Sequence, residues 1–303
     1  MESAFEGSIF DASASAYLLD NEQVMDANAD KFCSIAGARP ATGHSQNLTR
    51  DMVEKLAANR GTGWHGDTIK VESASQLLMI IELGLMNAQN AIGQGVVSLP
   101  WTTGSDTTTP YAAKTGSTSA LGNGTGRATS TTTYPGNVET TDTANGKTSV
   151  SWRGKENPWG NLWKFVGGMN IYGNGKMDGG QPYICNDFNF NESKHDGNYE
   201  AAGFTVTPKE GYISAMGYST ACDWLFVASE TNGNSNLPVG DYTYVTQNLN
   251  GSRIARLGGN WYRGTAAGPF CWALDGGVGS RYRNVGGRLV YVPNAENQQT
   301  VTF

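Results

Sequence analysis

Residues of the kinds that carry catalysis are present in this chain, but their spacing matches no catalytic motif. A serine nucleophile on a sharp strand-to-helix turn needs the pattern Gly-x-Ser-x-Gly, and the nearest match, at 217–221, ends in Ala221. The His-Glu-x-x-His pattern of zinc proteases is absent, because His44, His65 and His195 are isolated from one another. The Gly-x4-Gly-Lys-Ser/Thr loop that binds phosphates is absent as well.

Acidic residues form pairs that resemble the two carboxylates of glycosidases. Asp187 with Glu192, and Glu139 with Asp142, are examples, but pairs at such spacing are expected by chance among 27 acidic residues. We interpret them as acids of solvated loops. The sequence therefore predicts no enzyme, no metal site and no cofactor.

The four cysteines are far apart in the sequence. Cys33, Cys185, Cys222 and Cys271 show none of the Cys-x-x-Cys spacing typical of zinc sites. We expect buried, reduced thiols, with a Cys185–Cys222 disulfide as the alternative.

Composition excludes two classes of partner. With 21 basic and 27 acidic residues the net charge of the 303-residue chain is −6, whereas nucleic-acid binders usually carry a concentrated basic face. The most apolar run, Leu77 to Met86, is interrupted by Glu82 and is much shorter than the ~20 residues of a membrane span. No basic stretch followed by an apolar one opens the sequence, so we expect no signal peptide.

Helices are predicted only in the first third of the chain. The first is expected from an N-cap at Thr49 to about Asn59. For the second, Ser73 and Gln76 form a capping-box pattern before a helical stretch over 77–92. Because the centre of this stretch is apolar nearly all round, we expect the second helix to be buried.

The remaining chain predicts strands and long loops. Residues 1–40 are expected to form a strand segment packed on one main domain, 41–293, with a tail at 294–303. Thr, Gly and Ser dominate 102–149, which predicts a surface insertion that is partly strand. From 152 onward, short antiparallel strands separated by long Gly/Asn-rich loops indicate the α+β class.

Large apolar residues alternate with small or polar ones near the C-terminus. Phe270, Trp272 and Leu274 are separated by single small or polar residues, and Trp261 is flanked by polar ones. On an extended chain this alternation sends the large side chains to one face. An ordinary amphipathic strand and a rigid recognition platform both fit the pattern.

Residues 257–264 (LGGNWYRG), 267–274 (AGPFCWAL) and 284–289 (NVGGRL) resemble the variable region of diversity-generating retroelement target proteins. These are ligand-binding proteins of phages and bacteria with a C-type-lectin fold, related to the formylglycine-generating enzyme. Further matches extend the resemblance along the chain: GARP at 37–40, GWH at 63–65, IE at 81–82, NAQ at 87–89, ENPWG at 156–160 and DWL at 223–225.

The resemblance implies a C-type-lectin-like α+β domain in which a reverse transcriptase rewrites adenines in the codons of residues 253–290. The variable, outward-facing contact residues would be Asn260, Tyr262, Arg263, Ala266, Pro269, Cys271, Ala273, Asp275 and Gly276. Gly277, Ser280 and Tyr282 are less certain members of this set. The invariant packing residues would be Trp261, Phe270, Trp272 and Leu274.

The function implied is binding of a host or bacterial surface protein or glycan. A phage receptor-binding protein at the tail tip is the first expectation, and an adhesin displayed on a bacterial surface is the second. An enzyme of the related fold (a glycan hydrolase or a formylglycine-generating-type oxidase) and a structural virion component are the rivals. The expected location is the virion or the cell surface. A homo-oligomer stays open, as does the identity of the ligand.

Overall fold

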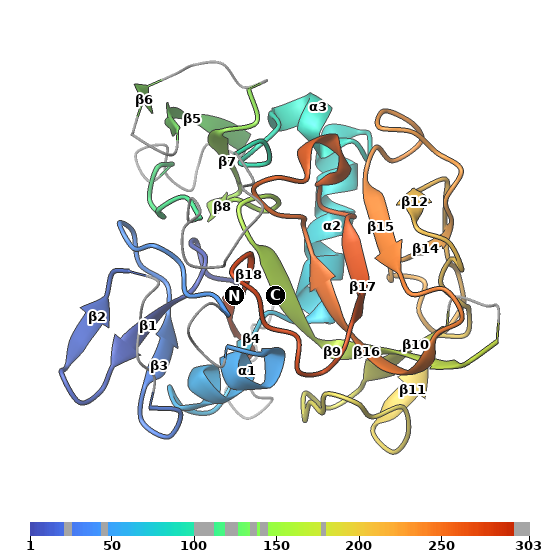
Figure 1. Ribbon diagram of the computed structural model, residues 1–303, viewed down its shortest axis with the longest axis horizontal. Coiled ribbons are helices and arrows are strands. Elements are labelled where there is room, and N and C mark those ends of the chain that lie inside the picture. The colour runs from blue at the N-terminus through green and yellow to red at the C-terminus, as the bar shows by residue number, and fades with distance from the viewer. Residues whose placement is uncertain are drawn as a thin grey trace, which may run out of the picture.

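The computed structural model describes residues 1–20, 26–43, 48–99, 112–118, 127–133, 138–139, 145–176 and 180–293. It is a mixed α and β structure, mostly strands, with three α-helices in the described part of the chain (Figure 1). The α+β class predicted from the sequence is confirmed.

A single large sheet organises the second half of the chain. Its strands, in spatial order, are β11 (Tyr199–Ala201), β10 (Gln181–Cys185), β9 (Trp163–Asn174), β16 (Asn250–Leu257), β17 (Trp272–Gly276), β15 (Tyr242–Val245) and β12 (Gly211–Tyr212), with β18 (Val285–Gly286) beside β9. Most pairs are antiparallel, as expected, but β15 with β17 and β18 with β9 are parallel. The expectation of short strands is wrong for β9, which is 12 residues long.

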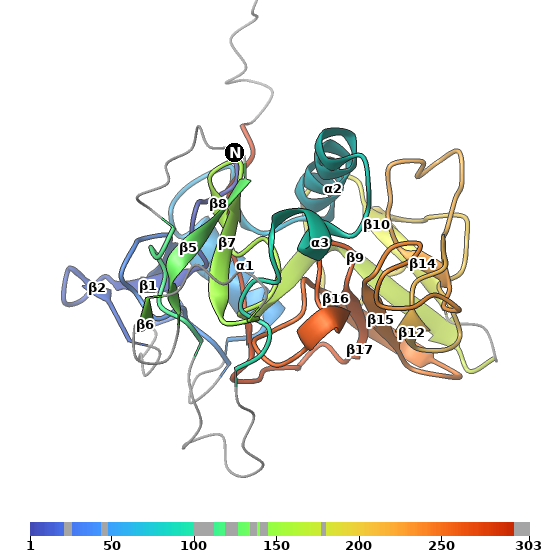
Figure 2. The same ribbon diagram turned by 90° about the horizontal axis from the view of Figure 1, so that it is seen from above.

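Both faces of this sheet are covered. Trp272 and Leu274 of β17 share a core with Ile69, at the start of helix α2 (Ile69–Leu83). Cys271 and Ala273 belong to a second core, which includes Val53 of helix α1 (Arg50–Ala58). Figure 2 shows α2 beside one face of the sheet. The alternation along β17 therefore separates two cores, rather than one core from solvent.

The first helix has the predicted limits, and the second does not. α1 begins after Thr49, whose hydroxyl accepts a hydrogen bond from the N–H of Met52. α2 begins earlier than predicted, after an N-cap at Thr68, and ends at Gly84, which has a φ of 67°. A left-handed residue ends a helix, and glycine adopts that conformation without strain. The predicted stretch therefore divides into α2 and a separate short helix, α3 (Ala88–Ile92).

The prediction that the second helix is buried is wrong for its outer face. Leu77, Leu78 and Ile81 are 44, 44 and 69% exposed. The buried side of α2 instead contains polar residues such as Glu72 and Gln76, which find partners inside the protein. Hydrophobic periodicity could not identify the buried side, because apolar residues surround the helix.

The N-terminal segment packs against helix α1 and the main sheet. It forms a three-stranded sheet of β2 (Ala16–Leu18), β1 (Ser8–Asp11) and β3 (Lys31–Cys33). Ile9 and Phe32 of this sheet pack in the same core as Leu56 of α1. Strands β4 (Trp64–Gly66) and β19 (Leu289–Tyr291) pair nearby, as do β13 (Ala215–Met216) and β14 (Ala228–Glu230) farther along.

The Thr/Gly-rich insertion is partly strand. The described strands of this region are β5 (Arg127–Thr133), β6 (Val138–Glu139), β7 (Thr148–Trp152) and β8 (Lys155–Glu156), which form one sheet. The surface location expected for 102–149 is wrong for Ala112 and Ala113, which are buried in a core with Trp261. Residues 102–111, 119–126, 134–137 and 140–144 of the insertion, and the tail at 294–303, lie outside the described residues.

The four cysteines are buried and free, so the prediction of reduced thiols is confirmed over a Cys185–Cys222 disulfide. Among the described residues, no helix has the length and apolar character needed to cross a membrane.

We expect Met79→Ala and Ile81→Ala, two residues apart on α2, to differ sharply in stability. Met79 is 3% exposed, and its truncation should lower the free energy of unfolding by about 2–5 kcal/mol. Truncation of exposed Ile81 should change that free energy by no more than about 0.5 kcal/mol. Urea titrations measure both, and equal losses would show that another surface covers α2.

Candidate ligand-binding cavity

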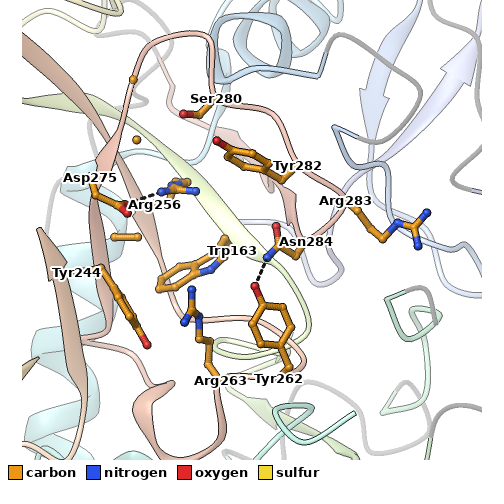
Figure 3. A pocket seen from close by; sticks show the side chains of 13 residues that line it. Trp163, Tyr244, Arg256, Tyr262, Arg263, Asp275, Ser280, Tyr282, Arg283 and Asn284 are labelled. Atoms are coloured by element: carbon orange, nitrogen blue, oxygen red, sulfur yellow. Dashed lines mark hydrogen bonds and ion pairs between the residues drawn. The ribbon is translucent and has the colours of Figure 1, made fainter. Parts of the chain in front are cut away.

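Three strands of the main sheet build the floor of a cavity. Ala273 on β17 is opposite Tyr244 on β15 and Arg256 on β16, so these three residues stand side by side across the sheet. Together with Trp163 of β9 they line a hollow of about 320 Å³. Its other lining residues are Tyr262, Arg263, Asp275, Gly276, Gly277, Ser280, Tyr282, Arg283 and Asn284 (Figure 3).

The loop that precedes β17 is held in place through its backbone. The Trp261 carbonyl accepts a hydrogen bond from the N–H of Leu99 at 2.7 Å, and the N–H of Gly264 donates to the Val97 carbonyl at 2.8 Å. The N–H of Gly258 donates to the Cys271 carbonyl, which closes the loop. These bonds do not depend on which side chains the loop carries.

Two glutamines from the helices hold the same loop, again by backbone carbonyls. Gln76 of α2 donates its Nε2 to the carbonyl of Pro269 at 2.7 Å. Gln89 of α3 donates to the carbonyl of Ala267 at 2.6 Å and to that of Gly264 at 3.1 Å. Gln89 belongs to the NAQ match at 87–89, and its role in the structure is to hold this loop.

The four scaffold residues are buried, as their alternation predicts. Trp261 is packed against Leu99 and Leu162, and Phe270 stacks edge-on against Phe226 at 5.7 Å. Trp272 and Leu274 lie in the core beneath α2, where the indole Nε1 donates to the carbonyl of Phe226 at 2.7 Å. These side chains anchor three separate cores around one loop.

Five of the nine expected contact residues line the cavity: Tyr262, Arg263, Ala273, Asp275 and Gly276. All three less certain members, Gly277, Ser280 and Tyr282, line it too.

The expectation of outward-facing side chains is wrong for three of the other four. Asn260 and Cys271 are completely buried, and Pro269 is buried as well. Ala266 is half-buried and does not line the cavity. Cys271 is buried because the second core covers that end of β17 and leaves only the far end, from Ala273 on, open to the cavity. Ala273 and Gly276 are themselves largely buried and contribute to the wall rather than protrude from it.

Sequence analysis did not identify five of the residues that line the cavity. Trp163, Tyr244 and Arg256 come from three other strands. Arg283 and Asn284 follow the less certain positions, and Asn284 lies within the matched NVGGRL stretch. No local pattern marks the three strand residues as neighbours, because only the sheet order brings them together.

Arg263 lies among the aromatic rings of the cavity. Its guanidinium lies 4.4 Å from the ring centroid of Tyr244, 5.2 Å from that of Tyr262 and 5.9 Å from that of Trp163. Such contacts stabilise a cation by roughly 0.5–2 kcal/mol. Arg256 is different, because its Nη2 donates to Asp275 Oδ1 at 2.7 Å and forms an ion pair.

No protein-family model matches this chain, and no curated protein matches it. What the cavity does is therefore inferred from its residues, their geometry and the resemblance of the C-terminal segment.

One cluster of acids has the spacing of a metal site, but a lysine occupies it. Carboxylate oxygens of Glu2, Asp67 and Glu72 lie within 4.8 Å of one another. Lys155 Nζ pairs with Glu2 and donates to Glu72 at 2.7 Å. Burial alone would raise the pKa of Glu72, but Lys155 lowers it to about 2. This network joins the N-terminus to α2. The ammonium group of Lys155 supplies the positive charge that a metal ion would bring to these carboxylates.

A buried carboxyl contacts the loop that precedes β17. Asp241 Oδ2 accepts a hydrogen bond from the N–H of Phe270 at 2.7 Å, and Oδ1 has no partner among the described residues. A Cβ at Gly268 would lie 2.1 Å from Oδ1, so only glycine fits there. Burial raises the pKa of Asp241 well above its ordinary value, and also raises that of the neighbouring Cys271 thiol.

We expect Asp241 to make the protein less stable as the pH rises. Because its pKa is raised on folding, the folded state binds more protons than the unfolded chain between the ordinary and the raised pKa. The contribution is complete below the ordinary Asp pKa of about 3.9 and is lost as the pH rises through the folded value.

The test is Asp241→Asn, which keeps an acceptor for the N–H of Phe270 and removes the titration. Denaturant titrations from acid to neutral pH should show a smaller fall in stability for the variant. They should also show a higher free energy of unfolding than the wild type at neutral pH. The same slope in both proteins would contradict this assignment.

Proposed function

We propose that this chain is a ligand-binding protein that recognises a surface molecule through the cavity described above. We further propose that it is a diversity-generating retroelement target protein with a C-type-lectin-like fold. The observation that carries the proposal is that five residues which the resemblance marks as contact residues line one cavity: Tyr262, Arg263, Ala273, Asp275 and Gly276.

The way the loop is fixed supports diversification. Its links to α2, α3 and the neighbouring loops use backbone N–H and C=O groups, and its large anchors are inside the protein. Substitution at exposed positions usually changes stability by no more than about 0.5 kcal/mol. Asp275, which is exposed, can therefore change without loss of the scaffold.

Binding without catalysis is the version of this function that the cavity favours. The rival oxidase would work through cysteines, and Cys271, within the variable segment, is buried with its thiol pKa raised. Tyr and Arg, which line the cavity, are residue types that dominate the energetics of recognition surfaces.

In the proposed setting the protein is the receptor-binding component of a phage tail tip, and its partner is a protein or glycan of the host surface. Display on a bacterial surface is the alternative. The genome tests whether the protein is diversified by a retroelement. The DNA that encodes residues 253–290 should have a near-copy close by, which differs from it chiefly at adenines. A reverse-transcriptase gene should lie beside that copy. A genome without that pair would contradict the retroelement part.

We expect Tyr262→Ala and Arg263→Ala each to weaken adsorption of the labelled protein to its host cells by at least about tenfold. Both side chains line the cavity and are partly exposed, and Tyr262 also packs against the core that contains Trp261. Flow cytometry on a panel of bacterial strains measures adsorption, and thermal melts confirm that the variants fold.

Two matched variants control for the loss of an exposed side chain elsewhere. Tyr218 is 69% exposed and outside the cavity. Arg153 also stacks on an aromatic ring, that of Trp152, but on another part of the surface. Tyr218→Ala and Arg153→Ala should adsorb like the wild type. Unchanged adsorption of both cavity variants would reject the cavity as the binding site.

A further inference from the structure

The cavity contains a cation that the protein itself leaves without a counter-ion. The Arg263 guanidinium forms no hydrogen bond or ion pair with any residue that the structure describes, and its Nε is buried without a partner. Its contacts are with the faces of the three aromatic rings around it. A guanidinium has five N–H donors in one plane, and that fork matches a carboxylate or a phosphate.

Figure 3 shows the Arg263 guanidinium between the rings of Tyr244 and Tyr262, directed toward Trp163. The aromatic walls fix the position of the side chain before any ligand arrives. An arginine already held in one geometry loses less conformational freedom on binding than one that is mobile in solvent.

Among the described residues that line the cavity, no acid forms an ion pair with this cation. Asp275 is the acid that lines the cavity, and its Oδ1 is 2.7 Å from Arg256 Nη2. The two charges of that ion pair offset each other, and Figure 3 shows Arg283 directed away from the hollow. A local positive site is an exception on a chain with a net charge of −6. One uncompensated positive charge matches a single negative charge better than the double charge of a phosphate monoester.

The remaining walls suit a compact, hydroxyl-bearing ring. A hollow of about 320 Å³ is at the small end of ligand sites, which span about 300–1,000 Å³. Tyrosine and tryptophan present an apolar face with a polar edge. Ser280, Tyr282 and Asn284 add donors and acceptors, and Asn284 Nδ2 already donates to the hydroxyl of Tyr262 at 2.9 Å.

From these observations we infer that the cavity binds a sugar ring that carries a carboxylate, such as a uronic acid residue of an acidic surface polysaccharide. The carboxylate is placed on Arg263, and the ring lies against the tyrosines. This inference rests on the proposed binding function and specifies its ligand.

The test compares methyl glucuronoside with methyl glucoside, which has the same ring without the carboxylate. Isothermal titration calorimetry on the full chain should show the glucuronoside binding at least about tenfold more tightly, as expected for a charge-assisted hydrogen bond. Arg263→Gln should remove that preference. Arg153→Gln is the matched control, because Arg153 stacks on Trp152 but pairs with Glu82 at 2.8 Å, and it should keep the preference.

Other outcomes overturn the inference in distinct ways. Equal binding of the two glycosides would show that the cavity does not recognise a carboxylate. A preference for the glucuronoside that survives in Arg263→Gln would show that Arg263 does not bind it. Tighter binding of N-acetylglutamate than of the glucuronoside would assign the cavity to an acidic peptide, and equal competition by inorganic phosphate would make it a general anion site.

If no sugar binds while Tyr262→Ala still abolishes adsorption to cells, the ligand class is wrong and the proposed function stands. If adsorption is also unchanged, both fail.

Discussion

Anchoring of residues 258–271 through their backbone is the constraint on which the rest of the cavity depends. The carbonyls of Gly264, Ala267 and Pro269 accept hydrogen bonds from glutamines on two helices. Hydrogen bonds from the backbone near Val97 hold the other side of the loop. A buried donor or acceptor without a partner costs about 1–3 kcal/mol, so these contacts define one conformation for the loop.

The main sheet converts this fixed loop into a binding wall. β17 leaves the loop with Trp272 in one core and Ala273 facing the other way, toward Tyr244 and Arg256. Because the second core covers the start of the strand, only its far end opens to the cavity. Residues with small side chains therefore have a use there: Ala273 and Gly276 leave space that larger residues would fill.

The charges of one ion-pair network and the charge of Arg263 are held in different ways. Those of Glu2, Glu72 and Lys155 are buried and satisfied by one another, and they join the N-terminus to α2. Breaking one partner of such a network leaves an uncompensated buried charge. The charge of Arg263, in contrast, is held by aromatic faces at the edge of solvent, with its hydrogen-bonding capacity available to a ligand.

The sequence by itself determined the elements that depend on local rules. The α+β class, the limits of α1 with its Thr49 cap, and the burial of Trp261, Phe270, Trp272 and Leu274 all follow from capping and from period-two alternation. Tyr262 and Arg263, which line the cavity, were identified from the resemblance of the C-terminal segment and not from these local rules.

Tertiary structure alone decided the rest. Helix α2 buries Gln76 because the side chain donates to the carbonyl of Pro269 inside the protein, while apolar Ile81 remains exposed. Cys271 is inside because α1 and the N-terminal sheet cover that face of β17, which no local pattern near residue 271 could indicate. Trp163, Tyr244 and Arg256 meet because the sheet order places three distant strands side by side, and strand order is a property of the whole chain.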